Sequence, residues 1–453
     1  MKNKRKITSS TTQIIMLSFL LVILVGSVLL SLPISTKSGK SVSYIDALFT
    51  ATTATCVTGL VTLPTVTIWS IFGQIVILLL IQIGGLGIIT IMAGLMIVLH
   101  RKIGLKGSQL ISDAFNINSL SGLTSFVKKV IIGTLIIEGI GALLYMPVFI
   151  PEFGAKGIWI SIFNSVSAFC NAGIDIIAEN SLCNYATNPL INIVTSLLII
   201  LGGLGYIVWW DIVRVFKNVK KLKWKCFHKL TLHSKIVLSA TAILILGGAI
   251  SIFIFEYNNP LTLKEYSLFD KIQIAFFQSI TTRTAGFATI PQENLTNASA
   301  IICLLLMFIG GSPVGTAGGI KTVTLVVLLA TAYSTIRNKN EVSLFNRNLS
   351  KQITRKAVAI MSMSFVIMFL STVLLSAVTN APALDILYET VSATATVGLS
   401  RNLTPFLNIW GKIIIIATMY FGRIGPISLA VAFQVKKENT NNIKNPTEDI
   451  SVG

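Results

Sequence analysis

Long apolar stretches alternate with short charged segments along the 453 residues of the chain. A transmembrane helix needs about 20 apolar residues to cross the roughly 30 Å hydrocarbon core of a bilayer. Six stretches reach that length, at residues 7–32, 66–99, 130–150, 180–210, 236–255 and 357–381; five of them are uncharged, and residues 130–150 contain Glu138. Two more are interrupted by one charge each, residues 294–335 by Lys321 and residues 413–435 by Arg423. The pattern therefore predicts an all-α membrane protein with eight transmembrane helices.

A glycine-centred motif recurs four times along the chain. Its copies, at residues 55–60, 169–174, 282–287 and 394–399, align on one glycine each. The positions up to and including that glycine are Thr55, Cys56, Val57, Thr58 and Gly59; Phe169, Cys170, Asn171, Ala172 and Gly173; Thr282, Arg283, Thr284, Ala285 and Gly286; and Thr394, Ala395, Thr396, Val397 and Gly398. An aromatic residue stands ten positions before each glycine, at Phe49, Phe163, Phe276 and Tyr388. Such recurrence indicates an internal repeat.

A second glycine cluster follows each motif at a similar spacing. The clusters begin at Gly84, Gly202, Gly310 and Gly422, which lie 25, 29, 24 and 24 residues after the first glycine. Each repeat unit is therefore expected to consist of an outer helix, a short helix, an extended stretch that contains the motif, and an inner helix. The two anchors predict four pseudo-symmetric units around one pore, at residues 1–110, 111–225, 226–345 and 346–435, with a cytoplasmic tail at residues 436–453.

The short helix before each motif glycine predicts a re-entrant pore segment, because about ten residues cannot cross a bilayer. Non-helical backbone survives at membrane depth only where it faces protein or a hydrated path. Glycine permits backbone conformations that turn carbonyl oxygens toward such a path, and rings of carbonyl oxygens can replace the hydration shell of an ion. Helix packing is the alternative role for glycines in a membrane bundle. We favour packing for Gly84, Gly85, Gly202 and Gly203 and a selectivity filter for the four motif glycines.

The third unit departs from the repeat at its second glycine cluster. Its segment reads Gly310, Gly311, Ser312, Pro313, Val314, Gly315, Thr316, Ala317, Gly318, Gly319, Ile320 and Lys321. Five glycines and a proline predict a break of the inner helix near the middle of the membrane. We interpret this flexible segment, directly beneath the filter, as a gate loop. A kink packed against neighbouring helices is the alternative.

Arg423 lies within the last inner helix at about the same depth as this loop. A charge inside the membrane needs a partner and indicates a functional site. The expected partners are carbonyl groups of residues 310–319, so that the guanidinium and the loop together form a barrier to cations. A salt bridge to Glu138 is the structural alternative. Lys321 could instead extend toward the inner membrane surface.

Composition supports a membrane protein, since 53% of the residues are hydrophobic, 12% are charged and the mean hydropathy is +0.79. The net charge of +19 could suggest nucleic-acid binding. With the amino terminus in the cytoplasm, however, the inner segments hold 26 basic and 6 acidic residues and the outer segments 8 and 10. This is the asymmetry of the positive-inside rule, so no nucleic acid is expected. The lysine-rich run at residues 214–229 fits anionic lipid or, more specifically, a cytoplasmic partner.

Other functional classes fit the sequence less well. The first apolar stretch is too long for the apolar region of a signal peptide and lacks a clear cleavage site. The five cysteines and three histidines show no metal-ligand or disulfide spacing, and no cluster of catalytic groups indicates an enzyme. A secondary transporter of an organic solute remains an alternative, although such proteins usually contain two or inverted repeats and polar groups at the midplane.

The four motifs, the loop at residues 310–321 and the segment Phe421-Gly422-Arg423-Ile424-Gly425-Pro426 resemble the Trk/Ktr/HKT potassium transporter superfamily, most closely its KtrB-type membrane subunits. The resemblance covers nearly the whole chain. It implies a pore in which the motif glycines select potassium, the loop acts as gate and Arg423 as its latch. It also implies a homodimer with a separate cytoplasmic ring of nucleotide-binding RCK-type regulators.

In the same superfamily, serine at the first filter position accompanies sodium transport, whereas all four positions are glycine here. The amino-terminal hairpin of Trk-type relatives is absent, which favours the Ktr type. The expected function is therefore potassium uptake across a bacterial plasma membrane, with both termini in the cytoplasm and K⁺ held by filter carbonyl groups. Sodium dependence stays open, and a Trk-type or sodium-conducting channel is the alternative.

Overall fold

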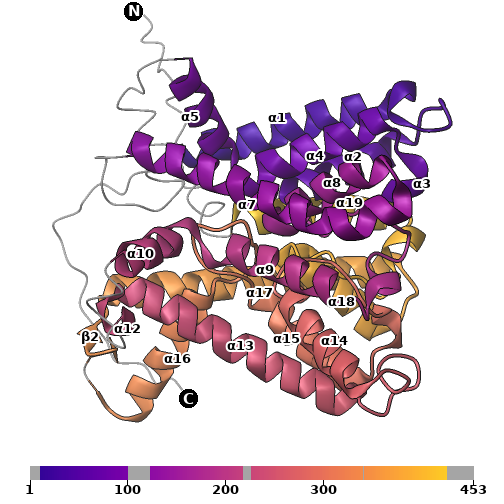
Figure 1. Cartoon of the computed structure of the whole chain (residues 1–453). Coiled ribbons are helices and arrows are strands. Elements are labelled where there is room, and N and C mark those ends of the chain that lie inside the picture. The colour runs from indigo at the N-terminus through magenta and orange to yellow at the C-terminus, as the bar shows by residue number, and fades with distance from the viewer. Residues whose placement is uncertain (1–10, 100–122, 218–225, 340, 426–453) are drawn as a thin grey trace, which may run out of the picture.

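The computed structural model describes residues 11–99, 123–217, 226–339 and 341–425, which form a mostly helical protein (Figure 1). The longer helices are α1 (Thr11–Ser31), α2 (Tyr44–Cys56), α4 (Ile71–Leu86), α5 (Ile88–Val98), α7 (Leu123–Phe153), α8 (Lys156–Cys170), α9 (Pro189–Leu204), α10 (Tyr206–Phe216), α13 (Leu232–Glu256), α14 (Leu268–Thr281), α15 (Asn297–Phe308), α16 (Thr322–Ile336), α17 (Lys351–Val378), α18 (Ala383–Ala395) and α19 (Ile409–Ile424). The short helices are α3 (Thr65–Ile68), α12 (Cys226–Lys229) and the 3₁₀ turns at Pro33–Ser35, Cys183–Tyr185, Gln292–Asn294 and Thr404–Phe406.

One small hairpin interrupts the otherwise helical architecture. Strands β1 (Ser343–Leu344) and β2 (Arg347–Asn348) pair antiparallel after α16. The hairpin separates the third unit from the fourth. The tail at residues 436–453, most of the lysine-rich run and the end of the last expected span lie outside the described residues.

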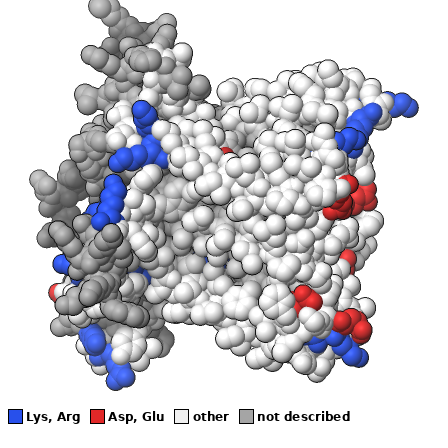
Figure 2. All heavy atoms as spheres, viewed as in Figure 1, with Lys and Arg blue, Asp and Glu red and all other residues white. Residues whose placement is uncertain are grey.

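Helices α1, α7, α13 and α17 are each long and apolar enough to cross a membrane unbroken. They present large apolar side chains to the outside, including Leu21, Leu143, Ile243 and Phe369, each at least half exposed. Figure 2 shows the same property as a wide surface without charges between two charged rims. An apolar belt of this extent marks a surface that faces lipid.

The four expected inner helices differ from the prediction of continuous spans, because the chain breaks within or at the end of each. Helix α4 ends at Gly87, α9 at Gly205 and α19 at Gly425, with φ of +83°, +89° and +87°. Their ψ values near 140° complete a conformation that only glycine adopts readily. The axes of α9 and α10 differ by 99° as a result. Among the described residues, four helices span the membrane unbroken, or five if the pair of α9 and α10 is counted as one bent span.

Four short helices, α2, α8, α14 and α18, lie inside the bundle and end directly at the four motifs. Each packs against its own outer helix, in the pairs α1 with α2, α7 with α8, α13 with α14 and α17 with α18. Each also contacts the inner helix of the preceding unit, in the pairs α4 with α8, α9 with α14 and α15 with α18. Helix α19 of the last unit packs on α2 of the first. The contacts between successive units therefore close into a circuit.

Glycines also allow close contacts between the helices of one unit. A side chain added at Gly84, Gly202 or Gly422 would meet a carbonyl oxygen at the end of a short helix, that of Thr55, Phe169 or Thr394, within 2.2 Å of its Cβ. On the outer helix α13, a Cβ at Gly248 would lie 2.4 Å from Ser279 Oγ of α14. These positions support the packing role expected from the sequence for Gly84 and Gly202.

Gly248→Val should destabilise the protein by about 1–3 kcal/mol, because the added methyl groups must displace α14 from α13. The adjacent Gly247→Val is the matched control, since a Cβ at Gly247 meets nothing within 4 Å. The midpoint of thermal unfolding of the detergent-solubilised variants measures the difference. Equal midpoints for both variants would contradict the packing interpretation.

Candidate functional site

The four motif segments adopt closely similar backbone conformations. The residue two positions before each glycine lies in the left-handed region, with φ of +56° at Val57, +59° at Asn171, +67° at Thr284 and +51° at Thr396. The glycines Gly59, Gly173, Gly286 and Gly398 then have φ of +96°, +64°, +83° and +97°. A β-branched residue in the left-handed region costs of order 1–3 kcal/mol, and such strain concentrates at functional sites. The surrounding structure therefore holds the same strained turn in all four copies.

The four glycines lie against one another in a closed ring. A Cβ built on Gly59 would lie 3.2 Å from the Cα of Gly398 and 2.4 Å from the carbonyl oxygen of Ala172. A Cβ built on Gly173 would lie 2.6 Å from the Cα of Gly286, and a Cβ built on Gly286 would lie 3.3 Å from the Cα of Gly398. Main-chain atoms rather than side chains consequently face the centre of the ring, and no larger residue fits there without displacement.

Hydroxyl groups on the last turn of the short helices fix three of these turns. Thr53 Oγ1 accepts the N–H of Gly59 at 2.9 Å, and Ser392 Oγ accepts that of Gly398 at 3.0 Å. In the second segment, Ser167 Oγ accepts the N–H of Ile174 at 3.1 Å. The sequence analysis missed these hydroxyls, although a serine or threonine stands six positions before the glycine in all three copies.

The third segment is one residue shorter than the others. The aromatic side chains Phe49, Phe163 and Tyr388 are fully buried, eight positions before the left-handed residue. In the third unit the expected Phe276 is 38% exposed, whereas Phe277, seven positions before Thr284, is 1% exposed. The buried aromatic residue that corresponds to Phe49 is therefore Phe277 and not Phe276, because the turn after α14 omits one residue and shifts the helix register. The hydroxyl that corresponds to Thr53, Thr281 Oγ1, donates to the Phe287 carbonyl oxygen at 2.6 Å.

A cavity of about 400 Å³ opens beyond the glycine ring on one side. All four motif glycines line it, together with the acidic residues Asp175, Glu179 and Glu293. Negative side chains in such a cavity raise the local concentration of cations.

The glycine-rich loop at residues 310–321 lies on the opposite side of the ring, against the second and third segments. Its base is closed by main-chain bonds from Ile320 N–H to the Phe308 oxygen at 3.1 Å and from Thr322 N–H to the Gly311 oxygen at 3.0 Å. The middle of the loop is tied to the second unit, since Thr316 Oγ1 donates to the Phe169 oxygen at 3.1 Å. The loop is therefore an ordered plug beneath the ring.

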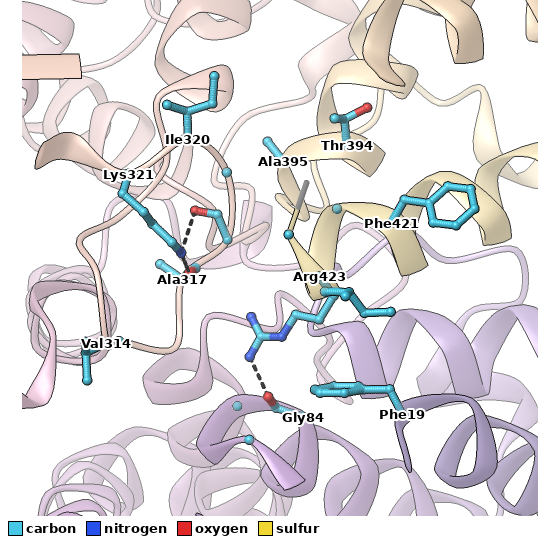
Figure 3. A pocket seen from close by; sticks show the side chains of 18 of the residues that line it. Phe19, Gly84, Val314, Ala317, Ile320, Lys321, Thr394, Ala395, Phe421 and Arg423 are labelled. Carbon is cyan, nitrogen blue, oxygen red and sulfur yellow. Dashed lines mark hydrogen bonds between the residues drawn. The ribbon is translucent and has the colours of Figure 1, made fainter. Parts of the chain in front are cut away.

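Arg423 on α19 reaches this loop from the fourth unit (Figure 3). Its Nη1 donates to the carbonyl oxygen of Thr316 at 2.6 Å, and its Nη2 donates to that of Gly84 on α4. Lys321 does not extend to a membrane surface; its Nζ donates back to the oxygens of Ala317 at 2.5 Å and Gly318 at 3.3 Å. Both cations thus bind carbonyl groups at the plug.

Glu138 does not pair with Arg423, the alternative considered from the sequence. Its carboxylate accepts a hydrogen bond from Gln82 Nε2 at 3.1 Å and contacts Cys170 Sγ at 3.8 Å, behind the second motif. Helix α18 carries a second buried carboxylate, Glu389, which accepts hydrogen bonds from Ser400 at 2.7 Å and from Thr404. These carboxylates brace motif segments rather than neutralise the arginine.

A second cavity, of about 380 Å³, lies on the loop side of the ring (Figure 3). It is lined by Arg423, Lys321, Gly315 and residues of the clusters after Gly84 and Gly422, and none of the described residues around it carries a carboxylate. A cation that passes from the outer cavity through the ring would therefore meet the loop and two positive charges before this inner cavity.

Comparisons with known proteins agree with this geometry. The TrkH family, described as cation transport protein, matches residues 2–445. The potassium/sodium uptake protein NtpJ of Enterococcus hirae is 39% identical over 100% of this chain and 99% of its own. The Ktr system potassium uptake protein B of Bacillus subtilis is 39% identical over 97% of this chain and 96% of its own.

The fold is also that of a solved transporter. The crystal structure of the potassium transporter TrkH from Vibrio parahaemolyticus matches with a TM-score of 0.75 and 16% sequence identity, over 96% of this chain and 87% of that one. The family match over nearly the whole chain and the two relatives at 39% identity lead to one conclusion. The chain belongs to the TrkH family of cation transport proteins and is a KtrB-type member of the Trk/Ktr superfamily.

Proposed function

We propose that this chain is the pore-forming subunit of a Ktr-type system for potassium uptake across a bacterial plasma membrane. The single observation that carries the proposal is the ring of Gly59, Gly173, Gly286 and Gly398, in which four strained main-chain turns face one axis. The names of the Enterococcus and Bacillus relatives, which describe uptake of potassium or of potassium and sodium, support the choice of ion.

The pore is formed by four pseudo-symmetric units of one chain, and the motif segments are its selectivity filter. The circuit of contacts that closes from α19 to α2 supports this arrangement. K⁺ is held by main-chain carbonyl oxygens, which replace its hydration water, and the carboxyl ends of α2, α8, α14 and α18 add partial negative charge. Glycine in all four copies favours potassium, while the name of the Enterococcus relative makes sodium the second candidate.

The loop at residues 310–321 is the gate, and Arg423 is the latch that holds it closed. Two hydrogen bonds of the guanidinium, to Thr316 of the loop and to Gly84 of the first unit, support this assignment. Hydrogen bonds that involve a charged group are each worth about 1.5–3 kcal/mol. The latch therefore contributes enough free energy to keep a two-state loop mostly closed.

Both termini lie in the cytoplasm, a topology that the excess of basic residues in the loops joining successive units supports. The inner cavity and the gate then face the cytoplasm, where a ring of nucleotide-binding RCK-type regulators acts on a homodimer of this chain. The Ktr system named for the Bacillus relative supports the presence of further components. Anionic lipid at the basic inner rim stabilises the complex.

Expression of the chain in a bacterium that lacks potassium uptake should restore growth on low potassium, with or without a regulator. Gly59→Ser should lower potassium uptake and the potassium-to-sodium uptake ratio by about tenfold, because its Cβ meets the Ala172 oxygen. Gly154→Ser is the matched control, since Gly154 also has a positive φ of +61° but open space around it. Sodium uptake without restored growth on low potassium would contradict potassium as the transported ion.

Arg423→Gln should raise potassium flux into proteoliposomes by about tenfold in the absence of any regulator, because the loop loses its charged hydrogen bonds. Lys412→Gln on the same helix is the control, since Lys412 pairs with Asp46 at 2.5 Å, far from the loop in sequence. Unchanged or lower flux in a monodisperse Arg423→Gln protein would show that the arginine does not hold the gate closed.

Potassium uptake should increase as the external pH rises through about 6. Asp175 lines the outer cavity beyond the membrane-spanning helices, and burial raises its pKa from 3.8 to about 6. Below this pH the carboxyl group is neutral; above it the carboxylate joins Glu179 and Glu293 in attracting cations. Asp175→Asn should remove the step, which we expect to be about twofold to tenfold at low ionic strength. An identical pH profile in the variant would exclude Asp175 as its origin.

A further inference from the structure

The third filter segment is joined to its inner helix differently from the other three. In those three, a helix-end carbonyl group touches a glycine of the inner helix, as Thr55 touches Gly84. In the shortened third segment, Arg283 lies at the same distance after the buried aromatic residue as Thr55 does in the first segment, so the two positions correspond. Its side chain, not its carbonyl group, makes the junction: Nη2 donates to the carbonyl oxygen of Gly310 at 3.2 Å. Gly310 is the first residue of the gate loop.

The next filter residue binds the other arm of the same loop. The N–H of Gly318 donates to Thr284 Oγ1 at 3.2 Å. Arg283 and Thr284 thus contact the beginning and the end of the loop. Among the described residues, no hydroxyl group accepts the N–H of Gly286. In the first and fourth segments, the hydroxyl groups of Thr53 and Ser392 accept the N–H of the motif glycine. The third segment therefore has the contacts with the loop in addition to the bond from Thr281 Oγ1 of its own short helix to the Phe287 carbonyl oxygen.

The surroundings of Arg283 offer no structural reason for a charge. The residue is 7% exposed and lies among Ile199, Leu204, Ile245 and other residues of α9 and α13. Its one hydrogen-bond partner in the described chain is Gly310, and its Nε has none. Burial of a guanidinium without a carboxylate is costly, and ionisable groups inside the membrane are retained for function. The other three segments have cysteine or alanine at the same distance from the glycine.

We propose that Arg283 is a positioning residue that fixes the third filter segment on the gate loop, so that the gate is also a support of the filter. The proposal rests on the proposed conduction of potassium through the glycine ring. Movement of the loop out of the path breaks the bonds at Gly310 and Gly318 together. The third segment then loses its two contacts with the loop and keeps only the support of its own short helix, so discrimination between potassium and sodium is weaker in the open state than in the closed one.

The test measures potassium and sodium fluxes of the full-length protein in proteoliposomes, with equal amounts of monodisperse protein. Arg283→Met keeps the length of the side chain but cannot donate, and it should lower the potassium-to-sodium flux ratio about tenfold, the factor expected for loss of a charged hydrogen bond. Arg283→Lys, which keeps a donor, should recover part of the ratio. Lys271→Met is the matched control, because Lys271 is a buried cation of α14 that donates to Tyr257 rather than to the loop.

Deletion of residues 310–319 supplies a second measurement that does not depend on the folding of the Arg283 variants. The deletion alone should lower the flux ratio, and Arg283→Met should have no further effect in that background, because its partner is gone. An unchanged ratio in the deletion protein, or an equal effect of Arg283→Met with and without the loop, would overturn the proposal. Absence of potassium flux from the unaltered protein would instead refute the proposed function.

Discussion

Irregular backbone inside an apolar protein must have every polar group either bonded or directed to a hydrated path, and this constraint governs the whole structure. Four segments of this chain break out of helical structure at membrane depth. Behind three of them, hydroxyl groups of the short helices bind main-chain N–H groups, while the turns at Gly59 and its three counterparts face one another. Main-chain atoms rather than side chains therefore face the axis of the ring, which is the arrangement on which the proposed filter rests.

The units support one another as well as themselves. Each short helix lies between its own outer helix and the inner helix of the preceding unit, and the last unit closes on the first. Contacts as close as that between Gly84 and the Thr55 carbonyl group require glycine, since any side chain would separate the helices. The same absence of side chains permits the breaks at Gly87, Gly205 and Gly425. Packing and helix breaking are thus two consequences of one glycine-rich cluster.

The loop that we propose as the gate contacts one of the four proposed filter segments in the third unit, where the repeat is least regular. The loop beginning at Gly310 is held by Arg423 from the fourth unit and by Thr316 to the second. It in turn contacts Arg283 and Thr284 of the filter. In the gate that we propose, the positive charges bound to the carbonyl groups of the loop repel cations, so that its closed state combines a steric and an electrostatic barrier. Release of one contact weakens the others, because all of them converge on about ten residues.

The sequence by itself determined the helical membrane architecture and the four motifs, because hydrophobic length and glycine spacing are local properties of the chain. The gate loop and the latch at Arg423 stay predictions. Nothing in the sequence indicated that Phe277 replaces Phe276, since a one-residue shortening leaves the spacing of the motif glycines intact. The partners of Arg423 and Glu138 were left as alternatives. Only the tertiary structure decided them, and only it joined Arg283 to Gly310, because these contacts connect residues between 27 and 339 positions apart and depend on how the helices pack.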